Sequence, residues 1–191
     1  AQGKSISEDY FDTAPALENA LAASGNPRLE EIARISRMAD IITVRQREPK
    51  GLGHAVLTAK NAVGNEPFVV YLPDDIIRGV PSATQQMLPV FERHGSVVAV
   101  EVISQVRFSA YGMVGGVELE PGVLRLDKVI EKPVVERAPS NLGIVGRYVL
   151  EPSVFDCLEL IQPGAFGELQ LTDAIAMLAE RGTMYSYAFQ G

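Results

Sequence analysis

The sequence contains one cysteine, two histidines and no tryptophan among its 191 residues. One cysteine cannot form an internal disulfide bond, so we expect a reducing, cytoplasmic setting. The longest apolar runs, such as 68–72 and 97–100, are far shorter than the roughly 20 residues that a membrane-spanning helix needs. We therefore expect a soluble protein that does not act at a membrane.

Positive charge is also scarce, because 17 Lys and Arg residues stand against 24 Asp and Glu residues and the formal net charge is −7. Such a chain repels polyanions, so we do not expect nucleic acid as a partner. A phosphorylated ligand would need local neutralisation by a few placed cations, by backbone N–H groups or by a divalent metal. The sequence offers no Ser/His/Asp or Cys/His arrangement for nucleophilic catalysis.

Apolar residues make up 47% of the chain, which is enough for one substantial core and predicts a single domain over residues 1–191. Short β-branched runs alternate with helical patterns in the first half, and this order predicts an α/β fold with a mixed, mainly parallel sheet flanked by helices. The expected strands are 41–44, 68–72 and 96–103, and the expected helices are 28–37, 53–62 and 82–94.

After Tyr111 the pattern changes from alternating strands and helices to consecutive strands. The tripeptide Glu120-Pro121-Gly122 predicts a β-turn between two antiparallel strands. The remaining predicted elements are strands at 112–119, 123–132, 142–150 and 184–189, a helix from Pro152 or Ser153, and a helix from Thr172. The chain starts at Ala1 and its final predicted strand meets Gly191, so we expect further sequence on both sides.

Three segments could carry chemistry. In the first, 45–56, a Gly-rich turn joins a strand to a helix, so a ligand could approach the backbone and the helix N-terminus favours an anion. The Gln46 amide has a donor and an acceptor, which suits the edge of a base. The alternative is a plain strand-to-helix turn with a glycine bend.

The second segment, 68–75, is an apolar strand that ends in Asp74 and Asp75. A carboxylate at the carboxyl end of a strand lies where open α/β sheets bind ligands, and it suits Mg²⁺. The alternative is an Asp that caps a turn or helix.

The third segment holds Glu131 and Lys132 before Pro133, which ends a strand. The lysine could hold a phosphate and the glutamate could accept sugar hydroxyls, whereas the alternative is two solvated charges.

Together, these segments resemble the bacterial UTP–glucose-1-phosphate uridylyltransferases, also called UDP-glucose pyrophosphorylases. The ordered set covers nearly the whole chain, and its stretch 167–173 (GELQLTD) favours this family over the related thymidylyltransferases. The matching segments are 8–12, 44–56, 72–75, 111–112, 129–133, 138–142, 146–148 and 163–173.

The resemblance implies the nucleotide-diphospho-sugar transferase (Rossmann-like) fold and the conversion of UTP and glucose 1-phosphate into UDP-glucose and pyrophosphate, with Mg²⁺. It implies that Asp74 binds the metal and that Asp74 and Lys132 are catalytic. We also expect a homo-oligomer. The implied substrate contacts are Gln46 and Gly51 to uracil, Gly112 and Glu131 to glucose hydroxyls, Lys132 to the sugar phosphate, and Tyr148 on the sugar side.

The sequence differs from the family pattern at both ends. Members begin with a strand and a Gly-rich loop that cradles the triphosphate, and they continue into a segment with a second metal-binding Asp. We therefore expect residues 1–191 to be a central fragment that is inactive alone. Two alternatives remain, namely a non-catalytic nucleotide-sugar-binding or assembly module, and a related sugar-1-phosphate nucleotidyltransferase with another base or sugar.

Overall fold

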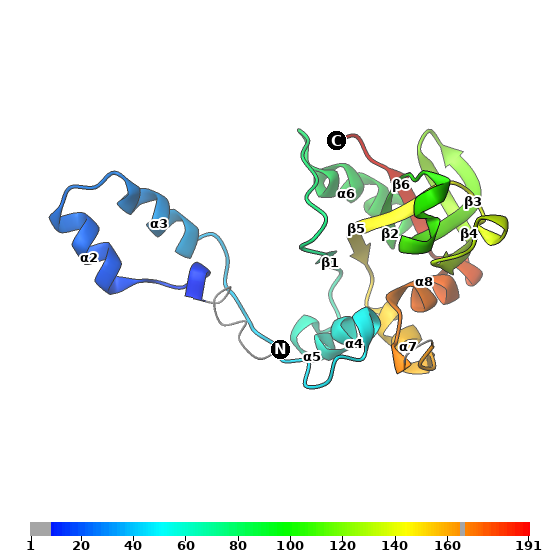
Figure 1. Cartoon of the computed structure of the whole chain (residues 1–191), viewed down its shortest axis with the longest axis horizontal. Coiled ribbons are helices and arrows are strands. Elements are labelled where there is room, and N and C mark those ends of the chain that lie inside the picture. The colour runs from blue at the N-terminus through cyan, green and yellow to red at the C-terminus, as the bar shows by residue number, and fades with distance from the viewer. Residues whose placement is uncertain (1–8, 165–166) are drawn as a thin grey trace. The chain divides into compact units, whose positions relative to one another are not determined.

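The computed structural model describes residues 9–164 and 167–191, and the motif residue Glu8 and positions 165–166 lie outside this description. The chain divides into two compact units, Ala1–Arg47 and Glu48–Gly191, and each is considered by itself (Figure 1). The expectation of a single domain over 1–191 remains a prediction. No helix in the described ranges has the length and apolar character needed to cross a bilayer.

In the described part of the first unit, a short helical stretch at 9–11 is followed by two longer helices and an extended segment. Helix α2 (Pro15–Ala23) contacts α3 (Arg28–Ser36), which confirms the helix expected at 28–37. The strand expected at 41–44 is wrong, because residues 39–46 have no strand hydrogen bonding and the Ile42 side chain is 77% exposed. A β-branched run becomes a strand only where a neighbouring strand supplies hydrogen-bond partners, and no described segment does so here.

The second unit is built on a six-stranded sheet with the order β1-β5-β2-β6-β4-β3, in which β5 also pairs with β3. The first half of β5 pairs with β3 and its second half with β1, so β5, β2, β6, β4 and β3 form a closed series of pairings. The strands are β1 (Phe68–Tyr71), β2 (Val97–Val102), β3 (Gly112–Glu120), β4 (Val123–Glu131), β5 (Leu142–Leu150) and β6 (Tyr185–Ala188).

The mixed sheet flanked by helices is confirmed, but the expectation of mainly parallel pairing is wrong. Only β2 and β6 pair in parallel, and the other five pairings are antiparallel. Strands β1 and β2 do run in the same direction, as a strand–helix–strand unit requires. They are not neighbours, because β5 lies between them and runs the opposite way.

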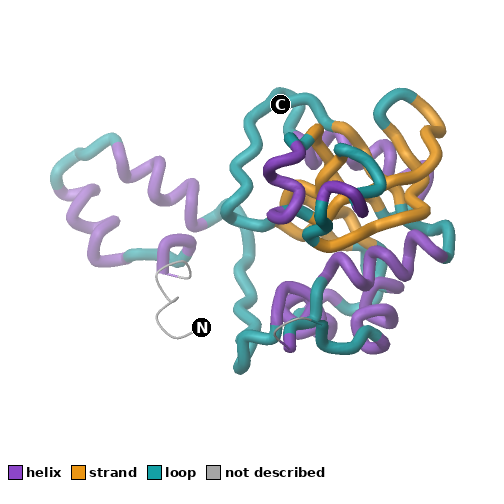
Figure 2. Tube along the Cα trace, turned by 45° about the vertical axis from the view of Figure 1, so that its right-hand side comes forward, coloured by secondary structure: helices purple, strands orange, loops and turns teal. Residues whose placement is uncertain are grey.

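Helices pack against both faces of this sheet, and Figure 2 shows helices beside and below the strands. On β2, Val97 and Ala99 pack with Met87 of α6 (Ala83–His94), whereas Val98 and Val100 face the core formed by the other helices. This alternation follows from the two-residue period of a strand. The helices on that second side are α4 (Gly51–Thr58), α7 (Ser153–Leu160) and α8 (Leu171–Glu180), while short elements at α5 (Lys60–Val63), η1 (Gln105–Ala110) and η2 (Val135–Arg137) complete the unit.

Local signals fix both ends of α6 and the turn between β3 and β4. The Ser82 hydroxyl accepts the Gln85 N–H at 3.3 Å and the Gln85 side chain accepts the Ser82 N–H at 2.9 Å, which is a capping box at the start of α6. Gly95, with φ 94°, follows the last residue of that helix. Gly122, with φ 78°, turns β3 into β4, so the predicted hairpin is confirmed.

Candidate functional site

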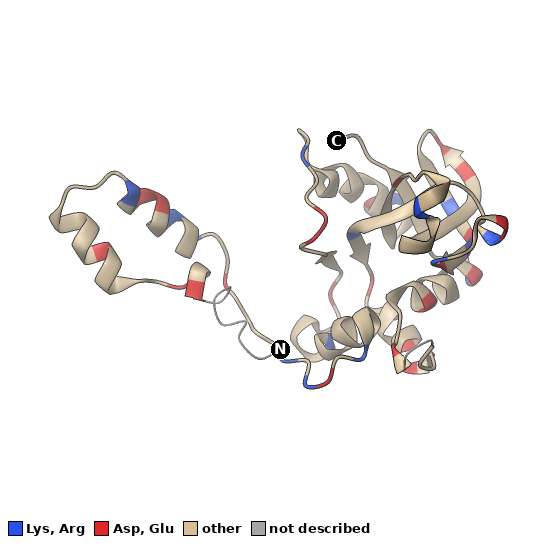
Figure 3. Cartoon of the chain, viewed as in Figure 1, with Lys and Arg blue, Asp and Glu red and all other residues tan. Residues whose placement is uncertain are grey.

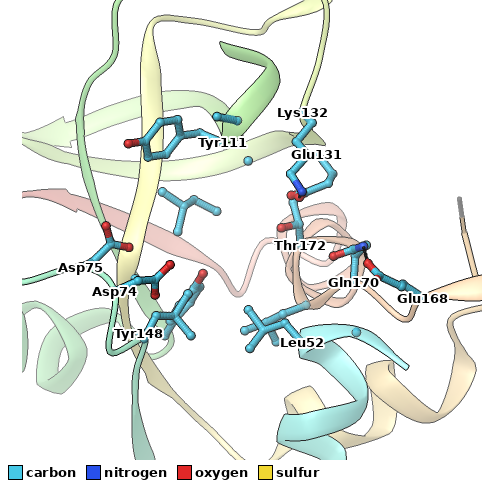
Figure 4. A pocket seen from close by; sticks show the side chains of 17 residues that line it. Leu52, Asp74, Asp75, Tyr111, Glu131, Lys132, Tyr148, Glu168, Gln170 and Thr172 are labelled. Carbon is cyan, nitrogen blue, oxygen red and sulfur yellow. Dashed lines mark hydrogen bonds and ion pairs between the residues drawn. The ribbon is translucent and has the colours of Figure 1, made fainter. Parts of the chain in front are cut away.

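One pocket of about 440 Å³ in the unit 48–191 contains six of the seven predicted site residues (Figure 4). Gln46 is half-buried in the other unit, and its role remains a prediction. The six predicted residues in the pocket are Gly51, Asp74, Gly112, Glu131, Lys132 and Tyr148, and the lining also includes Leu52, Asp75, Tyr111, Glu168, Gln170 and Thr172.

Two adjacent carboxylates lie on the turn that follows β1. The strand ends at Tyr71, and the Asp75 N–H donates to the Leu72 carbonyl at 3.3 Å, so residues 72–75 form a tight turn with Asp74 exposed. Burial, and then the charge of Asp74, raise the pKa of the Asp75 carboxyl group, and Arg147 acts in the opposite direction. Figure 4 shows Asp74 and Asp75 on one side of the pocket and Glu131, Lys132 and Thr172 on the other.

The donor set of this turn suits a magnesium ion that arrives with a phosphate. In the described ranges, no group of three or more His, Cys, Asp or Glu side chains could hold a metal ion. Mg²⁺ is usually bound by one or two carboxylates, with phosphate oxygens and water completing its shell. Asp74 and Asp75 supply that number of hard oxygen donors beside a pocket that is open to a ligand.

Glu131 and Lys132 face the same pocket although they are neighbours at the end of a strand. Lys132 has φ 45°, and among the described residues it alone has a positive φ without being glycine. This left-handed conformation breaks the alternation of β4, and the Lys132 N–H donates to the Tyr111 carbonyl at 3.0 Å. The Lys132 Nζ lies 3.6 Å from Glu131 Oε1, with the lysine side chain 55% exposed and the glutamate 23% exposed.

Gly112 lies between Glu131 and Thr172, and it pairs with Glu131 across the β3–β4 ladder. A Cβ atom at Gly112 would lie 3.1 Å from Glu131 Oε2 and 3.1 Å from the Thr172 side chain. Thr172 comes from the first turn of α8, so a strand and a helix approach each other here across a residue with no side chain. Gly112 therefore keeps the space that separates two polar groups of the pocket.

Replacing Gly112 with Ala should push Glu131 and Thr172 apart by a few tenths of an ångström. The resemblance implies that Gly112 serves the sugar side, and on that assignment we expect the KM for glucose 1-phosphate to rise by about tenfold with a smaller change in kcat, because about 1.4 kcal/mol of contact energy corresponds to that factor. Steady-state kinetics of the full-length protein measures the effect. Gly182→Ala, at an open turn outside the pocket with no atom near the added Cβ, is the control for KM, and its φ of 72° should lower the unfolding temperature of that variant. Equal KM values for G112A and G182A would contradict the assignment.

Tyr148 of β5 is 5% exposed and reaches the pocket from its floor. Burial, followed by the charges of Glu131, Asp75 and Asp74, raises the pKa of the Tyr148 phenol. The hydroxyl group is therefore protonated at neutral pH and can donate a hydrogen bond to a ligand oxygen. Its assignment to the sugar side remains a prediction.

The first turn of α4, with Gly51 and Gly53, packs on the segment that precedes α8. The Gly53 N–H donates to the Leu169 carbonyl at 2.8 Å, and the Leu169 N–H donates to the Lys50 carbonyl at 2.8 Å. Gly51 has φ 89°, and a Cβ there would lie 2.7 Å from the Leu169 oxygen. Both glycines are thus needed for packing, and contact between Gly51 and uracil remains a prediction.

Sequence reasoning gave no role to Glu168, Gln170 and Thr172, although the structure places all three in the pocket. The Gln170 side chain donates to Glu168 Oε2 at 2.8 Å. All three belong to the GELQLTD stretch at 167–173. Polar residues at the start of a helix were the signal that could have marked them as pocket residues. Burial and the charge of Glu131 raise the pKa of Asp173, the next residue of that stretch.

The pocket lining is acidic, with Asp74, Asp75, Glu131 and Glu168 as its carboxylates and Lys132 as its cation. Over the unit as a whole, acidic and basic positions are interspersed along strands and helices (Figure 3). A phosphorylated ligand would therefore have to be neutralised within the pocket, where Lys132 and a cation held by the carboxylates could supply the positive charge.

Comparison with known proteins finds relatives that act on nucleotides. The nucleotidyl transferase family model matches residues 19–191. The UTP–glucose-1-phosphate uridylyltransferase 1 of Staphylococcus saprophyticus is 41% identical over 186 residues, which are 96% of this chain and 65% of the relative. The uridylyltransferase of Bacillus subtilis is 41% identical over 192 residues, which are 100% of this chain and 66% of the relative.

A solved structure of a UDP-glucose pyrophosphorylase complexed with UDP-glucose superimposes with a TM-score of 0.87 at 40% identity, over 100% of this chain and 70% of that chain. The chain thus spans somewhat less than two thirds of the length of the curated relatives, at 65% and 66%. The match nevertheless extends over its whole length in both sequence and fold. The chain belongs to the nucleotidyl transferase family, in the group of the UDP-glucose pyrophosphorylases.

Proposed function

We propose that the protein of which this chain is part transfers a uridylyl group from UTP to glucose 1-phosphate, giving UDP-glucose and pyrophosphate. The observation that carries the proposal is the single pocket in which the Asp74–Asp75 turn lies opposite Glu131 and Lys132. One side suits a metal-bound triphosphate and the other suits a sugar phosphate. The names of the relatives support the same substrates.

The reaction needs charge neutralisation and alignment more than proton transfer. A phosphate oxygen of glucose 1-phosphate attacks the α-phosphorus of UTP and forms a new P–O bond, while the bond from that phosphorus to the bridging oxygen breaks and pyrophosphate leaves with the electron pair. The attacking phosphate is already anionic at pH 7, so no general base is required. This chemistry agrees with a pocket lining that contains no histidine among its described residues.

Several pocket residues then have a proposed task. Lys132 neutralises the sugar phosphate and holds it in line, and Glu131 accepts hydrogen bonds from sugar hydroxyls. Asp74, with Asp75 beside it, would hold Mg²⁺, which when bound neutralises the charge that develops on the transferred phosphoryl group. The backbone at Gly112 leaves room for the sugar between Glu131 and Thr172.

The proposal is tested by measuring pyrophosphate release by the full-length protein with UTP, glucose 1-phosphate and Mg²⁺, and again after chelation with EDTA. UTP should be preferred to TTP, ATP and CTP, and glucose 1-phosphate to the galactose and mannose esters. Binding of UDP-glucose without any turnover would identify a non-catalytic module. Preferred turnover with another base or sugar would identify a related nucleotidyltransferase.

Gln46 is proposed to read uracil, because a carboxamide can pair with the adjacent N–H donor and carbonyl acceptor of that base. Gln46→Ala should raise the KM for UTP by roughly tenfold or more, since one or two polar contacts of about 1–3 kcal/mol are lost, and should narrow the advantage of UTP over other triphosphates. Gln105→Ala, at an exposed position of η1, is the control. An unchanged nucleotide preference in Q46A would reject this role.

The homo-oligomeric state and the cytoplasmic location expected from the sequence remain predictions. Light scattering coupled to size-exclusion chromatography of the full-length protein tests the first, and fractionation of the source cells tests the second. A monomer across the micromolar range would contradict the oligomer.

A further inference from the structure

Arg147, the second residue of the Gly-Arg-Tyr stretch in β5, reaches across the sheet to the turn that carries Asp74. Its Nη1 donates to the Leu72 carbonyl at 3.1 Å and to the Gly146 carbonyl at 3.0 Å, and its Nη2 donates to the Asp75 carbonyl at 2.7 Å. One guanidinium group therefore bonds to the main chain at both ends of the 72–75 turn, on either side of Asp74.

Tyr71 also holds this guanidinium beside the turn. Arg147 pairs with Tyr71 in the β1–β5 ladder, and its guanidinium carbon lies 4.4 Å from the centre of the Tyr71 ring. The Tyr71 hydroxyl is hydrogen-bonded to the Thr84 hydroxyl at 2.6 Å, which ties the ring to α6. Among the residues that the structure describes, no carboxylate forms an ion pair with Arg147. The hydrogen bonds of its guanidinium go to main-chain carbonyls.

The neighbouring glycine brings the turn close enough for these contacts. Gly146 has φ 26°, and a Cβ atom at this residue would fall on the Asp75 side chain and within 3.0 Å of Leu72 Cβ. The Leu72 N–H also donates to the Gly146 carbonyl at 2.9 Å. Gly146 thus removes a steric barrier, and Arg147 then holds the approaching backbone.

We propose that Arg147 is a positioning residue that fixes the 72–75 turn, so that the Asp74 carboxylate is already oriented toward the pocket before the metal and its nucleotide bind. This inference rests on the proposed function and deepens it. Strand β1 ends at Tyr71, and the Leu72 N–H bond to the Gly146 carbonyl is the last main-chain bond between the turn and β5. Without Arg147, a doubly charged cation would pull a movable carboxylate toward itself. Fixing the donor in advance removes that reorganisation from the binding and transfer steps.

The geometry requires an arginine. Three carbonyl oxygens in two separate chain segments are satisfied by the planar fork of a guanidinium, whereas a lysine offers one compact ammonium and stacks less well on an aromatic ring. Arg147→Lys keeps the charge near Asp74 and removes the fork. It therefore separates positioning from simple electrostatics.

The test compares R147K with wild type and with Arg125→Lys, an exposed arginine on β4 outside the pocket. In the full-length protein without metal or nucleotide, amide hydrogen exchange within 72–76 should become roughly tenfold faster in R147K, because hydrogen bonds that hold the turn closed are lost. Electron paramagnetic resonance should show Mn²⁺ bound roughly tenfold more weakly. The Mg²⁺ concentration for half-maximal turnover should rise by a similar factor, while the KM for glucose 1-phosphate stays within twofold.

A merely structural role for Arg147 predicts a different result. R147K would then lower the unfolding temperature, accelerate exchange throughout β1 and β5, and change all kinetic parameters together, which would overturn the proposal. Unchanged exchange and Mn²⁺ affinity would overturn it as well.

Tyr71→Ala removes the ring beside the guanidinium and keeps the arginine. It should shift the same measurements in the same direction by a smaller factor, and it carries the test if R147K does not fold. If wild type releases no pyrophosphate, the proposed function fails, and the exchange and Mn²⁺ measurements still decide the role of Arg147.

Discussion

Replacing Asp74 with Asn should lower the kcat of the full-length protein by roughly 100- to 1,000-fold. The substitution keeps the size and shape of the side chain and removes the negative charge that would hold Mg²⁺ at the transferred phosphate. Metal stabilisation of phosphoryl charge is worth several kcal/mol, and each 1.4 kcal/mol corresponds to a factor of ten in rate. Asp74 is exposed on its turn, so the unfolding temperature should change little. Pyrophosphate release at saturating substrates and a thermal melt measure both quantities.

Two further variants define what the Asp74 result means. Asp127→Asn, at an exposed position on β4 outside this pocket, should leave kcat unchanged and controls for the loss of one acidic charge. Asp75→Asn should give a smaller loss than D74N, because burial disfavours the charged form of Asp75 and its backbone carbonyl, which Arg147 binds, remains in place. A D74N protein whose kcat stays within threefold of wild type would refute the metal assignment.

The elements that sequence reasoning located well are those whose signals are local. Ser82 and Gln85 form the start of α6 through their own hydrogen bonds, and Gly95 and Gly122 take the positive φ that their turns require. The hairpin at 120–122 and the strand β5 (Leu142–Leu150) have the expected positions. In each case the information lies within a few residues along the chain.

The pairing of strands was less predictable, because it depends on residues far apart in the sequence. Strand β5 begins at Leu142, about 40 residues after β2 ends at Val102. Nothing in the β1–α6–β2 segment indicates that β5 will lie between β1 and β2. The run at 41–44 has the composition of a strand but has no ladder in the described structure. Composition favours an extended backbone, and a partner strand decides whether a sheet forms.

The candidate site shows the same division. Asp74 could be placed from one rule, since a carboxylate after an apolar strand lies at the edge of the sheet. Strict alternation would put Glu131 and Lys132 on opposite faces, and only the left-handed backbone of Lys132 brings them together. The role proposed for Arg147 depends on carbonyl groups more than 70 positions away in the sequence, which no local pattern encodes.

Replacing Lys132 with Ala should raise the KM for glucose 1-phosphate and lower kcat/KM for that substrate by roughly 10- to 150-fold. The lysine is the cation among the described pocket-lining residues, and a charge-assisted hydrogen bond to a phosphate contributes about 1.5–3 kcal/mol. The KM for UTP should change by less than threefold, because Lys132 lies on the side of the pocket opposite the Asp74 turn. Initial rates over a matrix of the two substrate concentrations give both constants.

The left-handed backbone of Lys132 allows its charge to be separated from its conformation. Lys132→Gly removes the charge and relaxes the positive φ, so K132G should be about 1 kcal/mol more stable than K132A, which keeps the strain. If the charge carries the function, the two variants will have the same raised KM for glucose 1-phosphate despite their different unfolding temperatures, and Lys132→Arg will recover part of the loss. If K132G instead binds glucose 1-phosphate like wild type, the lysine ammonium has no part in holding the sugar phosphate, and the backbone turn at the end of β4 is what the pocket requires.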